Sequence, residues 1–506
     1  MRAHLEDRLD HPIKFVITAA LKQELPLDLL KSWGIEIVSA RALASGILDS
    51  PGFRPKTSAL AVITGVGPQR SKEAADQIIR HLKPLFVLNL GSCGMSPGED
   101  RSSALFPGSV LLPGRFVLEG GSTIEAEAEL PFCIHPSIDV MKGAALETRS
   151  EPLLGPDAGR GRRFVDMEAA VQARAFKEAA VPFYSVKVVS DLCSTPFQYQ
   201  ENLPLVRKGI SSLLEGLLPA AAEDPPMRPE ISVVIPVRNR ADMVIRAVRS
   251  VLSQTLPPRE VIVVDDCSSD DTVRAVRRQF GPGVRLIELE SPGGVSRARN
   301  AGIAEAASSW IALLDSDDQW EPKMLESLWG YLLKNPFFQI LQCEEIWIRN
   351  GRRVNRRRYH EKREGWIWDI SLHRCMISPS AVMFKKAVFQ RFGPFDETFP
   401  ACEDYDLWLR ITRWMPVGLD PNPGLIKYGG HEDQLSRSVP VLDHWRVKAL
   451  KKALKGERDR ERRRAIAAVM ERRLAILING AEKRGRKGAS RQYRQILAEL
   501  EPDLSC

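Results

Sequence analysis

The sequence lacks an apolar run long enough to cross a membrane. No stretch of its 506 residues approaches the roughly 20 consecutive apolar residues that a membrane-spanning helix needs. The first residues, MRAHLEDRLDHP, are charged and lack the apolar centre of a signal peptide. These two absences predict a cytoplasmic protein, whose contact with the inner membrane face, if it has any, is peripheral.

Paired cysteines are also missing. The eight cysteines are scattered along the chain, and no two of them form a C-x-x-C pair. This spacing argues against a structural zinc site and against a disulfide framework. A reducing compartment is the simplest expectation for such a chain.

Most of the chain has little excess of charge of either sign. The formal net charge is +8, but residues 441–506 alone carry 18 Lys and Arg against 9 Asp and Glu, which leaves the rest near −1. Apolar positions recur between these basic residues, which predicts a helical tail with a basic outer face. Such a face suits peripheral contact with an anionic membrane. Nucleic-acid binding is not predicted, because no aromatic residues are interleaved with the basic ones.

A proline-rich stretch divides the chain. PAAAEDPPMRPE, residues 219–230, has four prolines and no periodicity, which predicts a semi-rigid linker. It separates one domain, residues 1–218, from a second, residues 231–440, and the basic helical tail follows at 441–506. Strand and helix patterns alternate on both sides of the linker, which predicts two α/β domains.

In the second domain, three apolar runs end in polar or acidic residues. ISVVIPVRNR, VIVVDDCSSDDT and WIALLDSDD are separated by helical patterns, so an open parallel sheet would bring their ends to one edge. Asp315 and Asp317 could hold Mg²⁺ or Mn²⁺ and leave coordination sites for diphosphate oxygens. Asp266 could accept from a base or ribose, and Arg297 and Arg299 could face phosphate. The alternative for each acid is a helix cap or a solvated surface position.

These blocks resemble the family 2 glycosyltransferases, which have a GT-A fold with a Rossmann-like, mixed sheet. The matching segments are SVVIPVRNRA, SVLSQTLPPREVIVVDDCSSDDT, ARNAG, LLDSDD, EDYDLWLR and HEDQLS. The resemblance implies a nucleotide-sugar donor, a hydroxyl acceptor on a glycan, lipid or protein, a divalent metal and inversion at the anomeric carbon. It also implies roles for particular residues. On the donor side, Pro236 and Asp266 border the nucleoside, Arg299 faces the diphosphate, and Asp315 and Asp317 form the DXD-type motif. His431 approaches the metal, and Asp404 is the general base.

The chain departs from this family's pattern at a few positions. Arg238, Cys267 and Ser291 stand where the family often has an aromatic ring, Gly and Asn, so the base and the sugar are not assigned. The Gln-x-x-Arg-Trp motif of processive synthases is not met, because Arg410 precedes Arg413-Trp414 at the position of the Gln. Transfer of a single sugar is therefore the expectation.

In the first domain, three acids lie at the ends of predicted elements. Glu24 follows the strand IKFVITAA, Glu168 lies in a helix that we expect to open at Asp166, and Asp191 ends the strand FYSVKVVSD. A proton donor to a leaving base, a diol-binding carboxylate and a water-activating carboxylate would together suit cleavage of an N-glycosidic bond. Each acid could instead be a cap or a surface residue.

This half resembles the nucleoside phosphorylase/nucleosidase superfamily, in particular methylthioadenosine/adenosylhomocysteine nucleosidases. The matching segments are AALKQEL, TGVGPQRSKEAA, NLGSCGM, VDMEAAVQA and VKVVSD. The resemblance implies a nucleoside-like ligand, no cofactor, frequent dimerisation and the following roles: Asp191 acts on the purine, Glu24 positions water, Met167 and Glu168 contact the ribose, and Ser92, Cys93 and Gly94 line the pocket floor. A carboxylate in the nucleophile site repels phosphate, which favours hydrolysis.

Alternatives remain for both domains. The first could be a non-catalytic nucleoside-binding or scaffold module that regulates the transferase. The second could be an inactive transferase that serves for binding.

Overall fold

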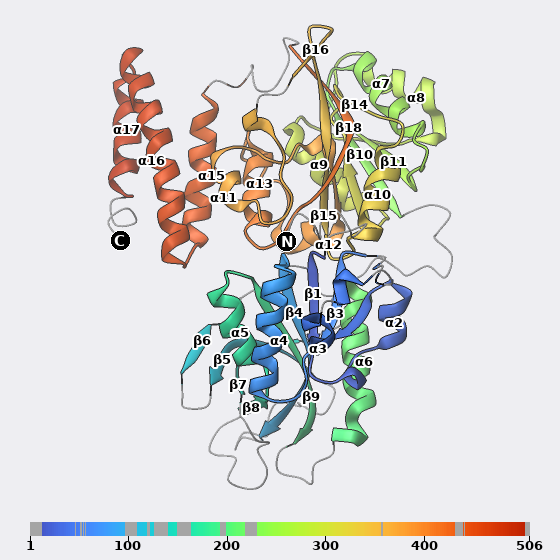
Figure 1. Cartoon of the computed structure of the whole chain (residues 1–506). Coiled ribbons are helices and arrows are strands. Elements are labelled where there is room, and N and C mark those ends of the chain that lie inside the picture. The colour runs from blue at the N-terminus through green and yellow to red at the C-terminus, as the bar shows by residue number, and fades with distance from the viewer. Residues whose placement is uncertain are drawn as a thin grey trace. The chain divides into compact units, whose positions relative to one another are not determined.

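The computed structural model describes residues 13–45, 47–50, 53, 55, 57–96, 109–118, 122–125, 140–148, 163–192, 199–217, 230–355, 358–430, 439 and 441–500. The chain divides into two compact units, the first formed by Met1–Pro225 with Leu332–Phe337 and the second by Pro226–Tyr331 with Phe338–Cys506 (Figure 1). Of the predicted linker, only Glu230 lies within the described residues.

The first unit is built on a mixed sheet. In the described residues its strand order is β2-β3-β1-β4-β8-β7-β5-β6, and β9 pairs with both β4 and β5. The strands are β1 Phe15–Ala19, β2 Glu36–Ser39, β3 Ala59–Ile63, β4 Phe86–Ser96, β5 Val110–Leu118, β6 Thr123–Glu125, β7 Val140–Thr148, β8 Arg163–Asp166 and β9 Phe183–Leu192. The helices are η1 Lys22–Glu24, α2 Leu27–Ser32, α3 Ala40–Ala44, η2 Ile47–Asp49, α4 Pro68–His81, α5 Ala169–Glu178 and α6 Tyr199–Leu217.

The start of α5 corrects one expectation from the sequence. Asp166 does not open the helix but ends strand β8, and α5 begins at Ala169. The Asp166 carboxylate accepts a hydrogen bond from the Ala169 amide at 3.0 Å, so it satisfies one of the free N–H groups of the first turn from outside the helix. A capping acid and a first-turn acid look alike in the sequence.

The second unit contains another mixed sheet, ordered β12-β11-β10-β13-β17-β15-β18-β14, with β16 paired to β15. The first four of these strands are parallel. The strands are β10 Ile231–Val237, β11 Glu260–Asp265, β12 Arg285–Glu288, β13 Trp310–Leu313, β14 Gln319–Trp320, β15 Ile340–Arg349, β16 Arg352–Val354, β17 Val382–Lys385 and β18 Gly418–Gly429. The helices that accompany them are α7 Ala241–Leu252, α8 Thr272–Phe280, η3 Gly281–Gly283, α9 Gly294–Glu305, α10 Met324–Lys334, η4 Arg358–His360, α11 Trp368–His373, η5 Pro379–Ala381, α12 Lys386–Phe392 and α13 Glu403–Thr412.

Close packing of α9 on this sheet fixes the residues that the helix carries. A Cβ atom added at Gly302 would lie 2.4 Å from Val234 of β10 and 3.0 Å from Val264 of β11. Real Cβ atoms do not approach that closely, so the helix needs glycine to lie at this depth. Arg299, one turn earlier on α9, is thereby held at the edge of the sheet where β10, β11 and β13 end.

The C-terminal segment folds into three helices, α15 Leu442–Gly456, α16 Arg460–Lys483 and α17 Lys487–Ala498. In the second unit α15 packs on α13 and α16 packs on α11, while α17 packs on α16 (Figure 1). Val447, Leu450 and Leu474 of these helices share one apolar cluster with Tyr405 and Leu409 of α13. Burial of such side chains contributes about 1.5–3 kcal/mol each, so the segment is part of this unit's core. None of the helices in the described part of the chain combines the length and apolarity that crossing a membrane requires.

Candidate functional site

A cavity of about 640 Å³ opens in the second unit where its parallel strands end. Its walls come from segments far apart in the sequence, because the ends of parallel strands meet at one edge of the sheet. The lining includes Pro236, Asp266, Arg299, Asp315, Asp317 and Asp404, the described residues to which the family resemblance gave roles. The sequence therefore predicted a set of residues that the fold brings together.

Asp266 has a structural role on the cavity wall. Its two carboxylate oxygens accept hydrogen bonds from the Gly293 and Gly294 amides at 2.7 and 2.9 Å, at the start of α9. The cap that we kept as an alternative is thus present. The Arg238 guanidinium lies 3.8 Å from the same carboxylate, so a ligand here would meet both charges.

Arg299 is buried between two acids. Its guanidinium contacts Asp315 at 2.6 Å and Glu403 at 2.7 Å, and its side chain is 3% exposed. Burial disfavours the cation, but the two carboxylates outweigh it and raise the pKa of Arg299. Arg299 lines the cavity as expected, but in this structure its charge orients Asp315 and Glu403.

The turn after β13 concentrates negative charge. Asp317 lies 3.2 Å from the Arg240 guanidinium, and Asp318 accepts a hydrogen bond from the Tyr428 amide at 3.0 Å. Burial, together with the charges of Asp317 and Asp315, raises the pKa of Asp318 to about 8 against the opposing effect of Lys427. A divalent cation would relieve this crowding of carboxylates.

The fit to a metal ion rests on Asp315 and Asp317. Among the described residues no group of three or more His, Cys, Asp and Glu side chains is arranged to hold a metal. Two carboxylates on a cavity wall nevertheless suit Mg²⁺ or Mn²⁺, which take their remaining ligands from water and phosphate oxygens. His431, the third ligand expected from the resemblance, lies outside the described residues.

Asp404 lies in the first turn of α13, opposite a cysteine. Its Oδ1 accepts from the Tyr405 amide at 2.7 Å, and the Cys375 thiol donates to its Oδ2 at 3.3 Å. Cys402, the N-cap residue of α13, has φ +64°, in the left-handed region that non-glycine residues rarely adopt. Such strain is often found at functional sites. It turns the chain into the helix so that Glu403 and Asp404 follow at once.

Two of the predicted acids of the first unit also converge. Glu24 accepts from the Ser92 amide and hydroxyl at 3.2 and 2.7 Å, and Glu168 accepts from the Gly67 amide at 3.3 Å. Lys187 acts electrostatically on Glu168, as does Glu24. Burial raises the pKa of Glu168 to about 7, with Lys187 lowering it and Asp166 and Glu24 raising it.

The other predicted residues of the first unit are placed unequally. Cys93 is buried, and Met167 is partly exposed beside Glu168. Asp191 and Gly94 face each other as backbone neighbours on β9 and β4, but their side-chain surroundings lie outside the described part of the structure. The structure therefore brings Glu24 and Glu168 together, while the surroundings of the Asp191 side chain lie outside its described part.

Several residues of these sites were missed from the sequence. Lys187 pairs with Asp166 at 3.1 Å in the interior, and Lys427, Tyr428, Leu442 and Arg446 line the cavity of the second unit. Lys187 interrupts the apolar run VKVV, which was the available signal. Leu442 and Arg446 gave no signal, because their helix is distant in sequence from the strand ends.

Comparison with known proteins agrees with this placement. Residues 232–392 match the model of glycosyl transferase family 2. A 100-residue segment is 45% identical to the succinoglycan biosynthesis protein ExoO of Rhizobium meliloti (strain 1021), covering 20% of this chain and 29% of that protein. An uncharacterized glycosyltransferase of Rickettsia bellii (strain RML369-C) is 30% identical over 221 residues, covering 42% of this chain and 31% of that protein.

The solved structures that resemble the chain include S. aureus TarS 1-349 in complex with UDP-GlcNAc. The two share 18% identity with a TM-score of 0.42, and the match covers 54% of this chain and 78% of TarS 1-349. By the family-model match, residues 232–392 of the second unit form a family 2 glycosyltransferase domain. The matches span less than a third of either curated relative's length. The activity of a whole relative therefore does not carry over to this chain.

Proposed function

We propose that the second unit transfers a single sugar from a nucleotide-sugar donor to a hydroxyl acceptor. The observation that carries this proposal is that Asp266, Asp315, Asp317 and Asp404 line one cavity of about 640 Å³. That volume is within the range of small-molecule sites. The missing Gln-x-x-Arg-Trp motif favours a single transfer over polymerisation.

Asp404 is the general base in this proposal. It accepts the proton of the acceptor hydroxyl while that oxygen attacks the anomeric carbon, and the bond from that carbon to the diphosphate oxygen breaks, which inverts the configuration. A general base of this kind contributes about 10²–10⁴ in rate.

Pro236 and Asp266 border the nucleoside, and Arg299 holds Asp315 in place from the buried side. Asp315 and Asp317 would hold the divalent metal, with His431 approaching it, and the metal would neutralise charge on the diphosphate.

The test is turnover of the purified chain against UDP-, GDP- and dTDP-sugars, scored by release of the nucleotide with Mn²⁺ or with EDTA. Wild type is compared with Asp317→Ala and Asp404→Asn. Metal-dependent release from one donor that both variants lose would support the proposal and identify the donor.

A matched control removes an acid outside the cavity. Glu326→Gln neutralises an exposed carboxylate of α10 that accepts a hydrogen bond from the Thr255 hydroxyl, and it should retain wild-type turnover. Donor binding without release in any combination would favour the alternative, a transferase fold kept for binding. Release that persists in Asp404→Asn would remove Asp404 from the role of base.

For the first unit we propose binding and hydrolysis of a nucleoside-like N-glycosidic bond. The observation behind it is that Glu24 and Glu168, two acids 144 positions apart in the sequence, interact with each other and with Lys187. A carboxyl whose pKa is near 7 can exchange a proton at neutral pH. Asp191 would act on the purine, and Ser92, Cys93, Gly94 and Met167 would contact the nucleoside.

Methylthioadenosine and adenosine are suitable probes, with release of adenine measured in the presence and absence of phosphate. Glu24→Gln and Asp191→Asn should abolish release, and added phosphate should not increase it. Binding of either nucleoside without adenine release would support the other function, a nucleoside-binding module. If the chain neither binds these nucleosides nor releases adenine, both functions are contradicted.

A further inference from the structure

The cavity of the second unit has a wall that the family match does not cover. The match ends at residue 392, whereas Leu442 and Arg446 of α15 line the same cavity as Asp404. Arg446 is therefore a fixed cation, always charged at physiological pH, on the surface that a substrate of this cavity would meet.

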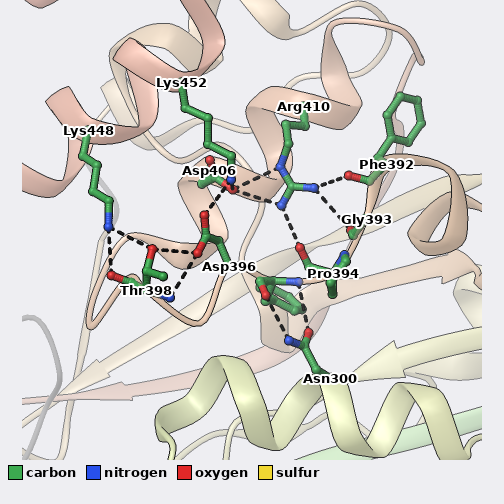
Figure 2. Close-up of polar contacts among 11 residues, drawn as sticks. Asn300, Phe392, Gly393, Pro394, Asp396, Thr398, Asp406, Arg410, Lys448 and Lys452 are labelled. Atoms are coloured by element: carbon green, nitrogen blue, oxygen red, sulfur yellow. Dashed lines mark hydrogen bonds and ion pairs between the residues drawn. The ribbon is translucent and has the colours of Figure 1, made fainter. Parts of the chain in front are cut away.

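The position of α15 is set by polar contacts as well as by its apolar face. Figure 2 shows Lys452 of α15 between Asp396 and Asp406, which it contacts at 2.8 and 3.0 Å. Lys448, one turn earlier, donates to the Thr398 carbonyl and hydroxyl at 2.9 Å each. With Val447 and Leu450 packed into the core cluster, the backbone that carries Arg446 is anchored on both sides.

Charge around Arg446 is not balanced. Arg446 and Arg473 both contact one carboxylate, that of Asp443, so two guanidinium groups share one acid. Arg473 also donates to the His373 carbonyl. Burial lowers the pKa of His373, and Arg472, Arg473 and Arg374 lower it further while Asp369 opposes them. Several cations thus gather near Arg446, with Asp443 as an acid that two of them share.

Arg446 lies near residues that flank the proposed base, Asp404, in the chain. The groups that act on its charge are Cys402, Asp443 and Tyr405, and Cys402 is itself under the influence of Asp404 and Arg446. The acids assigned to the donor follow β11 and β13 instead.

We propose that Arg446 binds an anionic group of the acceptor, a carboxylate or a phosphate, and so places a neighbouring hydroxyl at Asp404. This inference rests on the proposed transferase function and adds to it the chemical class of the acceptor. A guanidinium pairs with either anion through two parallel hydrogen bonds, which would orient the acceptor as well as hold it. Arg446 is thus a specificity-determining residue.

The test measures sugar binding to the full chain saturated with Mg²⁺ and the nucleoside diphosphate that it binds. The probes are pairs that share ring stereochemistry: glucose with glucuronate, glucose with glucose 6-phosphate, and galactose with galacturonate. We expect at least one anionic member to bind about 10-fold tighter than its neutral partner, the factor typical of one charge-assisted pair. Glucuronate and glucose 6-phosphate distinguish a carboxylate site from a phosphate site.

Arg446→Gln should bring the ratio of anionic to neutral sugar affinity close to one. Arg446→Lys should keep part of this preference because the charge remains. Lys455→Gln is the matched control, since it removes one positive charge from an exposed position of the same helix, and it should keep the full ratio. Three results would overturn the inference: no anionic preference in wild type, a preference that survives Arg446→Gln, or weaker nucleoside diphosphate binding in Arg446→Gln, which would place the residue at the donor. A failure of the proposed transferase function is distinct, because it would appear as the absence of metal-dependent nucleotide release in the turnover assay, whatever the sugar preference.

Discussion

Both units surround a buried cation with carboxylates, but in different proportions. In the second unit, Arg299 is shared by two acids, Asp315 and Glu403. In the first unit, Lys187 faces three, Asp166, Glu168 and Glu24. The side chains of both cations are at most 3% exposed, so solvent screens neither cation directly.

The excess of acids has a different consequence in each place. In the first unit, it contributes to a pKa of about 7 for Glu168, so this carboxyl is about half protonated at neutral pH. In the second unit, Asp317 and Asp404 lie on a cavity wall, where a substrate or cation can take up their charge. An acid near a buried cation can therefore hold a proton where it is itself buried, as Glu168 does, and offer a negative charge to a ligand where it lines a cavity, as Asp317 and Asp404 do.

The largest effect that we expect is on Asp404. Asp404→Asn keeps the size of the side chain and removes its basicity, so the rate of sugar transfer at saturating donor should fall by about 10²–10⁴. Single-turnover transfer to the best acceptor is the measurement. A fall below 10-fold, with an unchanged pH profile, would mean that another group accepts the proton.

Removing the buried cation of the first unit should have the next largest effect. Lys187→Met leaves the buried Asp166 without the ammonium that lies 3.1 Å away, and loss of one partner of a buried pair costs about 3–5 kcal/mol. Hydrogen exchange of peptides from α5 and β9 should quicken, while peptides from the second unit stay protected. Lys177→Met, an exposed position on α5, is the control. Unchanged exchange in Lys187→Met would show that the three acids tolerate the loss by taking up protons.

The pH dependence of the first unit should follow Glu168. Its folded pKa of about 7 exceeds the ordinary 4.5, chiefly because of burial, so the folded state holds the proton more tightly than the unfolded state does. This contribution to stability is full below about pH 4.5 and is lost as the pH rises through 7, a difference of roughly 3 kcal/mol. Glu168→Gln cannot ionise and should flatten the loss between pH 5 and 8, as measured by hydrogen exchange. Glu178→Gln, at an exposed position, should keep the wild-type slope.

The sequence predicted more of the second site than of the first. Apolar runs that end in acids were enough to predict that Asp266, Asp315 and Asp317 lie together, because strand ends in a parallel sheet share an edge, whereas Asp404 came from the family resemblance. Their roles remain predictions. Two kinds of feature could not be predicted: the use of Asp266 as a cap of α9, which depends on where two glycine amides point, and the wall formed by α15, which depends on helix packing across a long sequence separation.

In the first unit, the burial of a charged side chain could not be predicted from the sequence. Lys187 interrupts the apolar run VKVV, yet the structure buries it, and the helices α5 and α6 both pack on β9. Period-two patterns describe strands with one wet face, so a lysine buried in the middle of a sheet falls outside what they can predict.

The smallest effect that we expect concerns Lys452, a cation that also meets two acids but is 42% exposed. Lys452→Ala removes contacts to Asp396 and to Asp406, of which only Asp406 is deeply buried, at 2% exposed. Arg410 still lies 3.0 Å from Asp406 (Figure 2), so no buried charge is left alone, and exposed ion pairs contribute about 0–1 kcal/mol.

We therefore expect a loss of about 1 kcal/mol or less in urea unfolding followed by tryptophan fluorescence, which reports the second unit because Trp33 alone of the ten tryptophans precedes residue 300. Arg410→Met is the matched comparison, and it should cost more, because its guanidinium also donates to the carbonyls of Phe392, Gly393 and Pro394. If Lys452→Ala lowers stability as much as Lys187→Met does, then solvent exposure does not determine how much these cations stabilise the fold. The contrast between the two units would then have to rest on the number of acids around each cation alone.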